Sequence, residues 1–206
     1  GAECGTLEGM RIVVCVKHVP DMQSERRFEG GRLVRGEDDV LNELDENAIE
    51  AAVQLKESEE DAGREAEVVA LTMGPEDAED SLMRALQMGA DRAYIVSDEF
   101  LEGSDVITTA SVLAVAIAKI SEECGPVDLV ITGMASLDAM TSMLPGALAA
   151  KAHMPLLGLA RSLSVEDGTV TIERAVDGYT ETVRAALPAV VSVTDQINEP
   201  RYPAFA

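Results

Sequence analysis

The sequence predicts an α/β fold, namely a Rossmann-like three-layer domain with a mostly parallel sheet, extended by antiparallel hairpin strands near the C-terminus. Two patterns lead to this prediction. Between Arg11 and about His153, short apolar runs typical of strands covered on both faces alternate with segments of helical periodicity. After Leu159 the strand patterns shorten, and the turn signals Asp167-Gly168 and Asp177-Gly178 join them as hairpins.

The first half of the chain begins with a strand over residues 12–16, an apolar and mostly β-branched run. A helix over 42–57 follows, because its apolar side chains recur at helical spacing and its early carboxylates suit the positive end of the helix dipole. A strand over 68–71 leads to Pro75, where a helix can begin without losing a needed donor. Gly89 ends that helix.

The second half continues the alternation with a strand over 93–96 and a long helix over 106–122, capped by Ser104-Asp105. A strand over 128–132 then leads through a loop into a small-residue helix that ends near His153. The four remaining predicted strands cover residues 159–165, 170–176, 181–186 and 189–193.

Composition excludes several classes of function. The chain has 206 residues, 47% hydrophobic and 26% charged, as in ordinary globular proteins. Its net charge of −22 opposes binding to nucleic acid or to anionic membrane surfaces. No apolar run approaches the roughly 20 residues of a membrane span, so no membrane insertion is predicted. The three cysteines form no C-x-x-C pair and no disulfide framework, which favours a reducing, cytoplasmic setting.

Residues 1–9 have no periodicity and precede Met10, so we interpret them as a leader before the native start. Residues 10–206 are then predicted to form a single nucleotide-binding α/β domain. The most acidic stretch, 57–67, is interpreted as a solvated helix end and loop rather than as a metal site.

A ligand site is expected where loops leave the carboxyl ends of the parallel strands. Three such loops cover residues 17–21, 72–75 and 133–138. The last two carry glycine with small or hydroxyl residues before a helix, where backbone amides can bind an anion. Neither matches the G-x-G-x-x-G or the P-loop signature, so a nucleotide cradle and plain strand-to-helix turns both remain open.

Few residues suit catalysis. His18 borders the predicted crevice, where a general acid–base role and a surface or capping role both remain open. His153, near a helix end, suits the dipole there, and Cys15 fits a buried small hydrophobe. The residues therefore favour binding over bond breaking, and no catalytic or metal-ligating residue is predicted.

Segments spread along the chain carry a family resemblance. They are RIVVCVKHVPD (11–21), MQSERR (22–27), NELDENAIEAA (42–52), MGP (73–75), RALQMGADR (84–92), GSDV (103–106), VDLVITG (127–133), GMASLDAM (133–140), LPAVVSVTD (187–195) and NEPRY (198–202). Together they resemble the beta-subunit family of electron transfer flavoproteins, in the version found in high-GC Gram-positive bacteria. The resemblance runs from Met10 to the last residue.

This resemblance implies a heterodimer with a larger alpha subunit, carrying one FAD held mostly by alpha and one AMP buried in beta. The flavin takes electrons from acyl-CoA and related dehydrogenases, in fatty acid oxidation, and passes them through a quinone oxidoreductase to the quinone pool. The beta subunit is then an electron-carrier subunit without turnover of its own, not an enzyme.

The resemblance also implies the positions of the cofactor site. They are Cys15, Asn42, Glu43, Leu44, Asp45, Met73, Gly74, Gly133, Met134, Ala135, Ser136, Leu137, Asp138, Ala139, Met140, Thr141 and Ser142. Backbone amides of 139–141 and the hydroxyls of Thr141 and Ser142 are expected to bind the phosphate. Adenine is expected against Cys15, Leu44 and Met73. Met22 falls where the family often places an aromatic residue near the flavin.

The sequence departs from the family pattern at three places. Asp138 is retained, but the residues after it differ; Asn42-Glu43 replaces a usual Asn-Pro; and the sequence stops at Ala206, before the family's recognition loop and C-terminal arm. Two alternatives therefore stay open. One is an ATP-binding regulatory homodimer of the universal-stress type, and the other is a flavin-bifurcating relative with a second FAD in the beta pocket.

Overall fold

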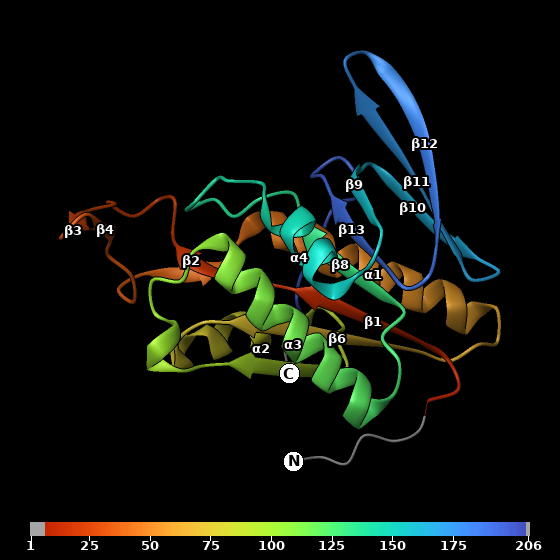
Figure 1. Ribbon diagram of the computed structural model, residues 1–206, viewed down its shortest axis with the longest axis horizontal. Helices are drawn as coiled ribbons and strands as arrows, with labels where there is room; N and C mark the ends of the chain where they lie inside the picture. Colours follow the sequence, from red (N-terminus) through yellow and green to blue (C-terminus); the bar gives the residue numbers. More distant parts are fainter. Residues whose placement is uncertain (1–6, 205–206) are drawn as a thin grey trace.

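The computed structural model describes residues 7–204 (Figure 1). Residues 1–6, most of the predicted leader, lie outside the described residues. The strands are β1 (Met10–Cys15), β2 (His18–Pro20), β3 (Phe28–Glu29), β4 (Arg32–Leu33), β5 (Asp39–Leu41), β6 (Ala66–Met73), β7 (Arg92–Val96), β8 (Leu129–Gly133), β9 (Leu156–Ala160), β10 (Ser162–Glu166), β11 (Thr169–Val176), β12 (Tyr179–Ala186) and β13 (Ala189–Val193). The α-helices are α1 (Glu43–Asp61), α2 (Glu79–Gln87), α3 (Val106–Cys124) and α4 (Leu144–Ala152), and the 3₁₀ turns are η1 (Glu76–Ala78) and η2 (Glu99–Leu101).

Six strands form the central sheet in the order β7-β6-β1-β8-β13-β9, and every neighbouring pair is parallel. The chain builds outward from β1 to β6 and β7, and then returns to place β8 on the other side of β1. Cys15 at the end of β1 is in register with Leu71 of β6 and Thr132 of β8. The predicted parallel sheet is confirmed, and its strand order reverses between β1 and β8.

Helices cover both faces of this sheet. Alternate residues of β1 show the two layers, because Ile12 and Val14 pack into the cluster that includes α1 and α2, whereas Val13 packs with α3 and α4. Figure 1 views the sheet with α3 in front of the strands. Asp105 caps α3, as predicted, by accepting a 2.7 Å hydrogen bond from the Thr108 amide.

The C-terminal strands divide between two sheets. A separate antiparallel sheet has the order β10-β11-β12, and its β11–β12 hairpin projects from the body in Figure 1. The single strand predicted over 159–165 is wrong. Strand β9 of the parallel sheet ends at Ala160 and β10 of the antiparallel sheet begins at Ser162, just after Leu159, whose φ is 62°. Strand β13 then inserts between β8 and β9.

Short pairings that the sequence did not predict flank the first crevice loop. His18–Pro20, expected as loop, pairs antiparallel with Asp39–Leu41, and β3 pairs with β4 in a small hairpin. The acidic stretch 57–67 contains the end of α1, a turn and the start of β6, close to the expectation. Among the described residues, no group of three or more acidic, histidine or cysteine side chains could hold a metal ion.

Two further findings concern the cysteines and the lengths of the helices. The cysteine pattern indicated no disulfide framework, but Cys124, at the end of α3, is disulfide-bonded. The sequence spacing of cysteines could not reveal this, because it does not show which side chains meet in space. Within residues 7–204, no helix is long and apolar enough to cross a membrane.

Candidate functional site

The candidate site lies at the carboxyl ends of β1 and β8, and we call the region between these two strand ends the crevice. From β1 the chain continues through β2–β5 to α1 on one face of the sheet, and from β8 it continues to α4 on the other face. Connections that leave neighbouring strands toward opposite faces open a space between them, which is where open parallel sheets bind ligands. The loop 133–143 between β8 and α4 forms one wall of this space.

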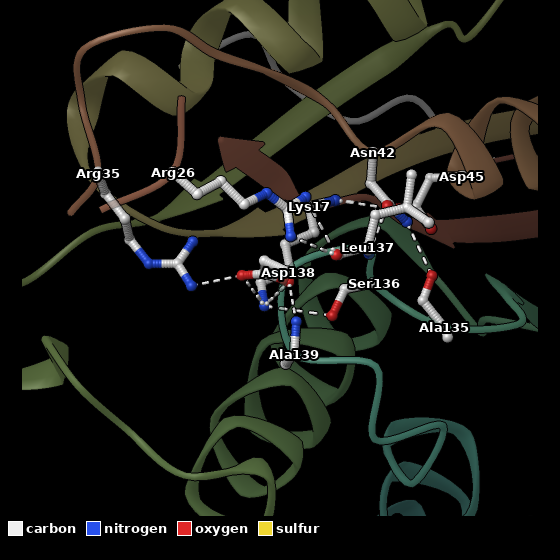
Figure 2. A network of polar contacts seen from close by, with 10 residues as sticks. All are labelled: Lys17, Arg26, Arg35, Asn42, Asp45, Ala135, Ser136, Leu137, Asp138 and Ala139. Carbon is white, nitrogen blue, oxygen red and sulfur yellow. Dashed lines mark hydrogen bonds and ion pairs between the residues drawn. The ribbon is translucent and has the colours of Figure 1, made fainter. Parts of the chain in front are cut away.

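Asn42 and Lys17 hold this loop from the side of β1 (Figure 2). The Asn42 side chain donates from Nδ2 to the Ala135 carbonyl (2.9 Å) and accepts at Oδ1 from the Leu137 amide (3.0 Å). Lys17 Nζ reaches Asp138 Oδ1 at 2.9 Å and Ser136 Oγ at 3.4 Å. Asn42, just before α1, therefore holds the loop at Ala135 and Leu137, and Lys17, just after β1, holds it at Asp138.

Positive charge gathers around Asp138. Lys17 and Arg35 both form ion pairs with its carboxylate, and Arg26 donates from both terminal nitrogens to the Leu137 carbonyl at 3.3 Å. Burial raises the pKa of Asp138, but the hydrogen bonds from Lys17 and Arg35 outweigh it and hold that pKa well below its usual range. Lys17 and Arg35 thus pair with the Asp138 carboxylate, and Arg26 lies beside it on the Leu137 carbonyl, so three cationic side chains gather at this edge of a chain whose net charge is −22.

The end of the loop presents unused backbone donors. The amide of Ala139 already donates to Asp138 Oδ1 (2.8 Å), and that of Met140 donates to the Ser136 carbonyl (2.9 Å). The next three amides, of residues 141–143, donate to no acceptor within the part of the chain that the structure describes. Helix α4 begins directly after them without a side-chain cap, so its positive pole adds to this cradle.

The backbone of this segment is shaped for an anion. Met140 and Ser142 have positive φ angles of 53° and 52°, and Met143 returns to the right-handed region. Alternation between left- and right-handed residues turns successive amides toward one point, which is the geometry of anion-binding nests. Non-glycine residues with positive φ are uncommon and gather at functional sites. The hydroxyls of Thr141 and Ser142 are exposed beside these amides.

Asp45 and Cys15 form the floor of the crevice. Asp45 is buried and accepts a 2.8 Å hydrogen bond from the Lys17 amide. Burial raises the pKa of Asp45 to about 7. Burial, together with the nearby charge of Asp45, raises the pKa of Cys15 to about 12, so this thiol stays neutral and acts as an apolar surface. A Cβ on Gly133 would lie 2.5 Å from Asp45 Oδ1, so only glycine fits there.

The structure gathers most of the predicted site residues. Cys15, Asn42, Leu44, Asp45 and the loop from Gly133 to Ser142 surround the crevice, with Met134, Ala135, Ser136 and Leu137 as parts of that loop. Met73 ends β6 and Gly74 follows it; β6 is the neighbour of β1 on the side away from β8. Glu43, the first residue of α1, is exposed, and Met22 is 55% exposed.

Sequence reasoning missed the cationic side chains. Lys17 was named only as part of a loop, and Arg26 and Arg35 were assigned no site role. The available signal was the concentration of arginines in the segment 26–35 of a very acidic chain. By contrast, His18 is buried and its Nδ1 lies 2.7 Å from Ser81 Oγ, so its ring is engaged away from the crevice loop.

Comparison with known proteins gives a consistent result. A family model described as "Electron transfer flavoprotein domain" matches residues 31–206. The "Electron transfer flavoprotein subunit beta" of Mycobacterium leprae is 42% identical over 197 residues, covering 94% of this chain and 73% of that protein. The protein of the same name from Megasphaera elsdenii is 36% identical, with coverages of 94% and 72%. The "Caffeyl-CoA reductase-Etf complex subunit CarD" of Acetobacterium woodii is also 36% identical, with coverages of 94% and 71%.

Proposed function

Because this chain belongs to the electron transfer flavoprotein family, we propose that it works as a beta subunit that binds AMP in the crevice between β1 and β8. In this proposal it pairs with an alpha subunit and helps to hold the FAD that alpha mostly binds. The carrier takes electrons from acyl-CoA and related dehydrogenases in the cytoplasm and delivers them through a quinone oxidoreductase to the quinone pool.

The observation that carries the AMP proposal is the excess of donors over acceptors at the crevice edge. Lys17, Arg26 and Arg35 converge on a loop with one carboxylate, and three free amides follow at the start of α4. A phosphate is the ligand that such a combination favours. The residues present therefore fit a nucleoside monophosphate, whose phosphate would bind residues 141–143 and the hydroxyls of Thr141 and Ser142.

The nucleoside half has a suitable wall. The Cys15 thiol is neutral, and Leu44 and Met73 are only partly covered, so these three side chains offer apolar surface to a purine. Met22 presents an exposed thioether that can pack against a flavin ring. FAD, when bound, supplies the one-electron and two-electron chemistry, and the residues of this chain bind and orient the nucleotides.

The side chains at the crevice suit cofactor binding rather than catalysis by this chain. The Cys15 thiol is held neutral, and the His18 ring is engaged with Ser81. The side chains of Lys17 and Asn42 hold the loop in place. We therefore propose a carrier subunit rather than an enzyme with its own turnover.

The direct test is to purify the complex with its alpha subunit, denature it, and identify the released small molecules by mass spectrometry and visible absorbance. One FAD and one AMP per heterodimer are expected. Two FAD and no AMP would favour the flavin-bifurcating alternative, for which the similarity to a subunit of a caffeyl-CoA reductase–Etf complex is the supporting observation. ATP released from a colourless homodimer would overturn the proposal in favour of a universal-stress-type regulator.

A further inference from the structure

Asn42 stands at a position where asparagine usually has a different task. It is the N-cap residue of α1, and asparagine is among the preferred N-cap residues because its side chain accepts from the amides of the first helical turn. Here the side chain makes no cap hydrogen bond. The helix therefore forgoes a stabilising contact, and the amide is used elsewhere.

Both ends of that amide are committed to the crevice loop. Nδ2 donates to the Ala135 carbonyl at 2.9 Å, and Oδ1 accepts from the Leu137 amide at 3.0 Å. The main-chain amide of Asn42 also donates to the Lys17 carbonyl at 2.9 Å. The residue is 1% exposed, so its side-chain amide is enclosed by these contacts. It links the end of β1, the start of α1 and the loop after β8 (Figure 2).

We propose that Asn42 is a positioning residue, which sets the conformation of the nucleotide loop without touching the nucleotide. This inference rests on the proposed AMP site and revises the role of Asn42 from ligand contact to support. Without its side chain, the carbonyl of buried Ala135 and the amide of Leu137 lose their partners. Buried polar groups left unpaired are unfavourable, so the loop must move to find water.

Movement of the loop would reach the ligand-binding groups directly. Asp138 follows Leu137, and the cradle of residues 141–143 lies a few positions further on. A shift at 135–137 therefore changes where Asp138 meets Lys17 and where the free amides point. The expected consequence is weaker AMP binding, although no contact to AMP has been removed.

The experiment compares two buried asparagines of α1 in the complete protein, produced with its alpha subunit. Asn47 is 7% exposed and donates to the carbonyl and the side-chain oxygen of Asn198, both at 3.1 Å, away from the crevice loop. Asn42→Ala and Asn47→Ala each remove a buried side-chain amide that hydrogen-bonds to a distant part of the chain. The dissociation constant for AMP is measured by calorimetry on nucleotide-free complex, and the melting temperature is measured in parallel.

We expect Asn42→Ala to weaken AMP binding by about tenfold or more, since two buried hydrogen bonds to the loop are lost. Asn47→Ala should lower the melting temperature and leave the AMP dissociation constant unchanged. A third variant, Asn42→Ser, separates stability from positioning. Serine can supply the cap hydrogen bond that Asn42 does not make, so it should raise the melting temperature above that of Asn42→Ala, but it is too short to join Ala135 and Leu137.

AMP affinity in Asn42→Ser that stays as low as in Asn42→Ala, at a higher melting temperature, would support positioning. Recovery of AMP affinity together with the melting temperature would overturn it, because a merely structural role predicts that the two recover together. An unchanged AMP dissociation constant in Asn42→Ala would overturn it as well. Failure of the unmodified complex to bind AMP would instead overturn the proposed function, so the two failures are distinguishable.

Discussion

The two ends of the central sheet both contain buried charge, but three consecutive backbone amides without an acceptor among the described residues lie at the carboxyl end. At the amino end, Arg11 is buried and pairs with Glu67 at 2.8 Å, and Arg92 pairs with the same carboxylate. The Arg11 amide donates to Asp128 Oδ2 at 2.9 Å. At this end the Glu67 carboxylate therefore serves as the shared acceptor of two arginines.

At the carboxyl end the corresponding groups are out of balance. Asp45 accepts the Lys17 amide much as Asp128 accepts the Arg11 amide. Here, however, Lys17 and Arg35 share the Asp138 carboxylate, Arg26 lies on the neighbouring Leu137 carbonyl, and the amides of 141–143 have no acceptor among the described residues. Charge at a sheet end is therefore uninformative by itself. The surplus of donors is what distinguishes a binding site from a structural network.

The largest expected effect is that of Gly133→Ala, which would break the carboxyl end alone. The new Cβ would lie 2.5 Å from Asp45 Oδ1 and 2.9 Å from the Leu44 carbonyl oxygen, so the backbone must move. We expect a loss of about 3 kcal/mol in unfolding free energy and no measurable AMP binding. Urea unfolding and calorimetry on the complex measure the two effects.

The matched control is Gly146→Ala in α4, where the added Cβ would meet only Leu156 Cδ2 at 3.8 Å. Alanine in a helix interior is favoured over glycine, so this variant should be neutral or slightly stabilising. Normal AMP binding by Gly133→Ala would show that the floor of the crevice is not where we place the nucleotide.

The second prediction uses the buried carboxyl of Asp45. Burial raises its folded-state pKa from 3.8 to about 7, so folding favours the protonated form. The associated stability is present below about pH 4 and is lost as the pH rises through 7. Relative to Asp45→Asn, the unmodified protein should therefore lose about 2 kcal/mol of unfolding free energy between pH 5 and pH 8.

Urea unfolding at one-unit pH intervals tests this prediction, with the difference between the two proteins as the quantity of interest. Taking the difference removes the repulsion among the many surface carboxylates, which changes with pH in both proteins. Parallel stability curves for the unmodified protein and Asp45→Asn would show that Asp45 is already ionised in the folded state at low pH.

The contrast between the two ends also shows how far the sequence could lead. The apolar runs of β1, β6, β7 and β8 predicted the parallel sheet, because burial on both faces leaves a continuous apolar pattern. The same apolar pattern indicated that the loop after β8 lies at the carboxyl end of a strand. It could not predict the position of β13 in the sheet, because five buried residues in a row do not specify which strands lie on either side.

The cationic half of the site was hidden for a different reason. Arg26 and Arg35 lie in a segment without helical or strand periodicity, and they reach the loop across more than one hundred residues of sequence. Asn42 was placed in the site only through the family resemblance, since its pattern alone indicates a helix cap. Contacts that are distant in sequence, and not secondary structure, determine this crevice.

The third prediction concerns the carboxylate of Asp138, which Lys17 and Arg35 share. Asp138→Ala removes the carboxylate that Lys17 and Arg35 share and the acceptor for the Ala139 amide. We expect several-fold lower AMP retention and a lower heterodimer yield, with about 1 kcal/mol of stability lost because both cations are partly exposed. Because the Asp138 pKa is depressed, this stability is present at neutral pH and disappears as the pH falls below about 4.

Retention is measured as AMP per complex after gel filtration. Glu181→Ala serves as the control, since it removes an exposed ion pair with Arg174 on the projecting hairpin. A bulky side chain at exposed position 139, as in Ala139→Leu, should lower retention by obstructing the loop. If both Asp138→Ala and Ala139→Leu keep their AMP, the loop after β8 is not the phosphate site.

The smallest expected effect tests the amino end. Arg92→Met removes one of the two cations on Glu67 and leaves Arg11 in place. Since Arg92 is partly exposed and its aliphatic part is preserved by methionine, we expect a loss of about 0.5 kcal/mol and an unchanged AMP dissociation constant. A weakened dissociation constant in Arg92→Met would mean that charge at the amino end influences the crevice through the strands. The two ends would then be one electrostatic system, and the surplus of donors at the carboxyl end could no longer be interpreted by itself.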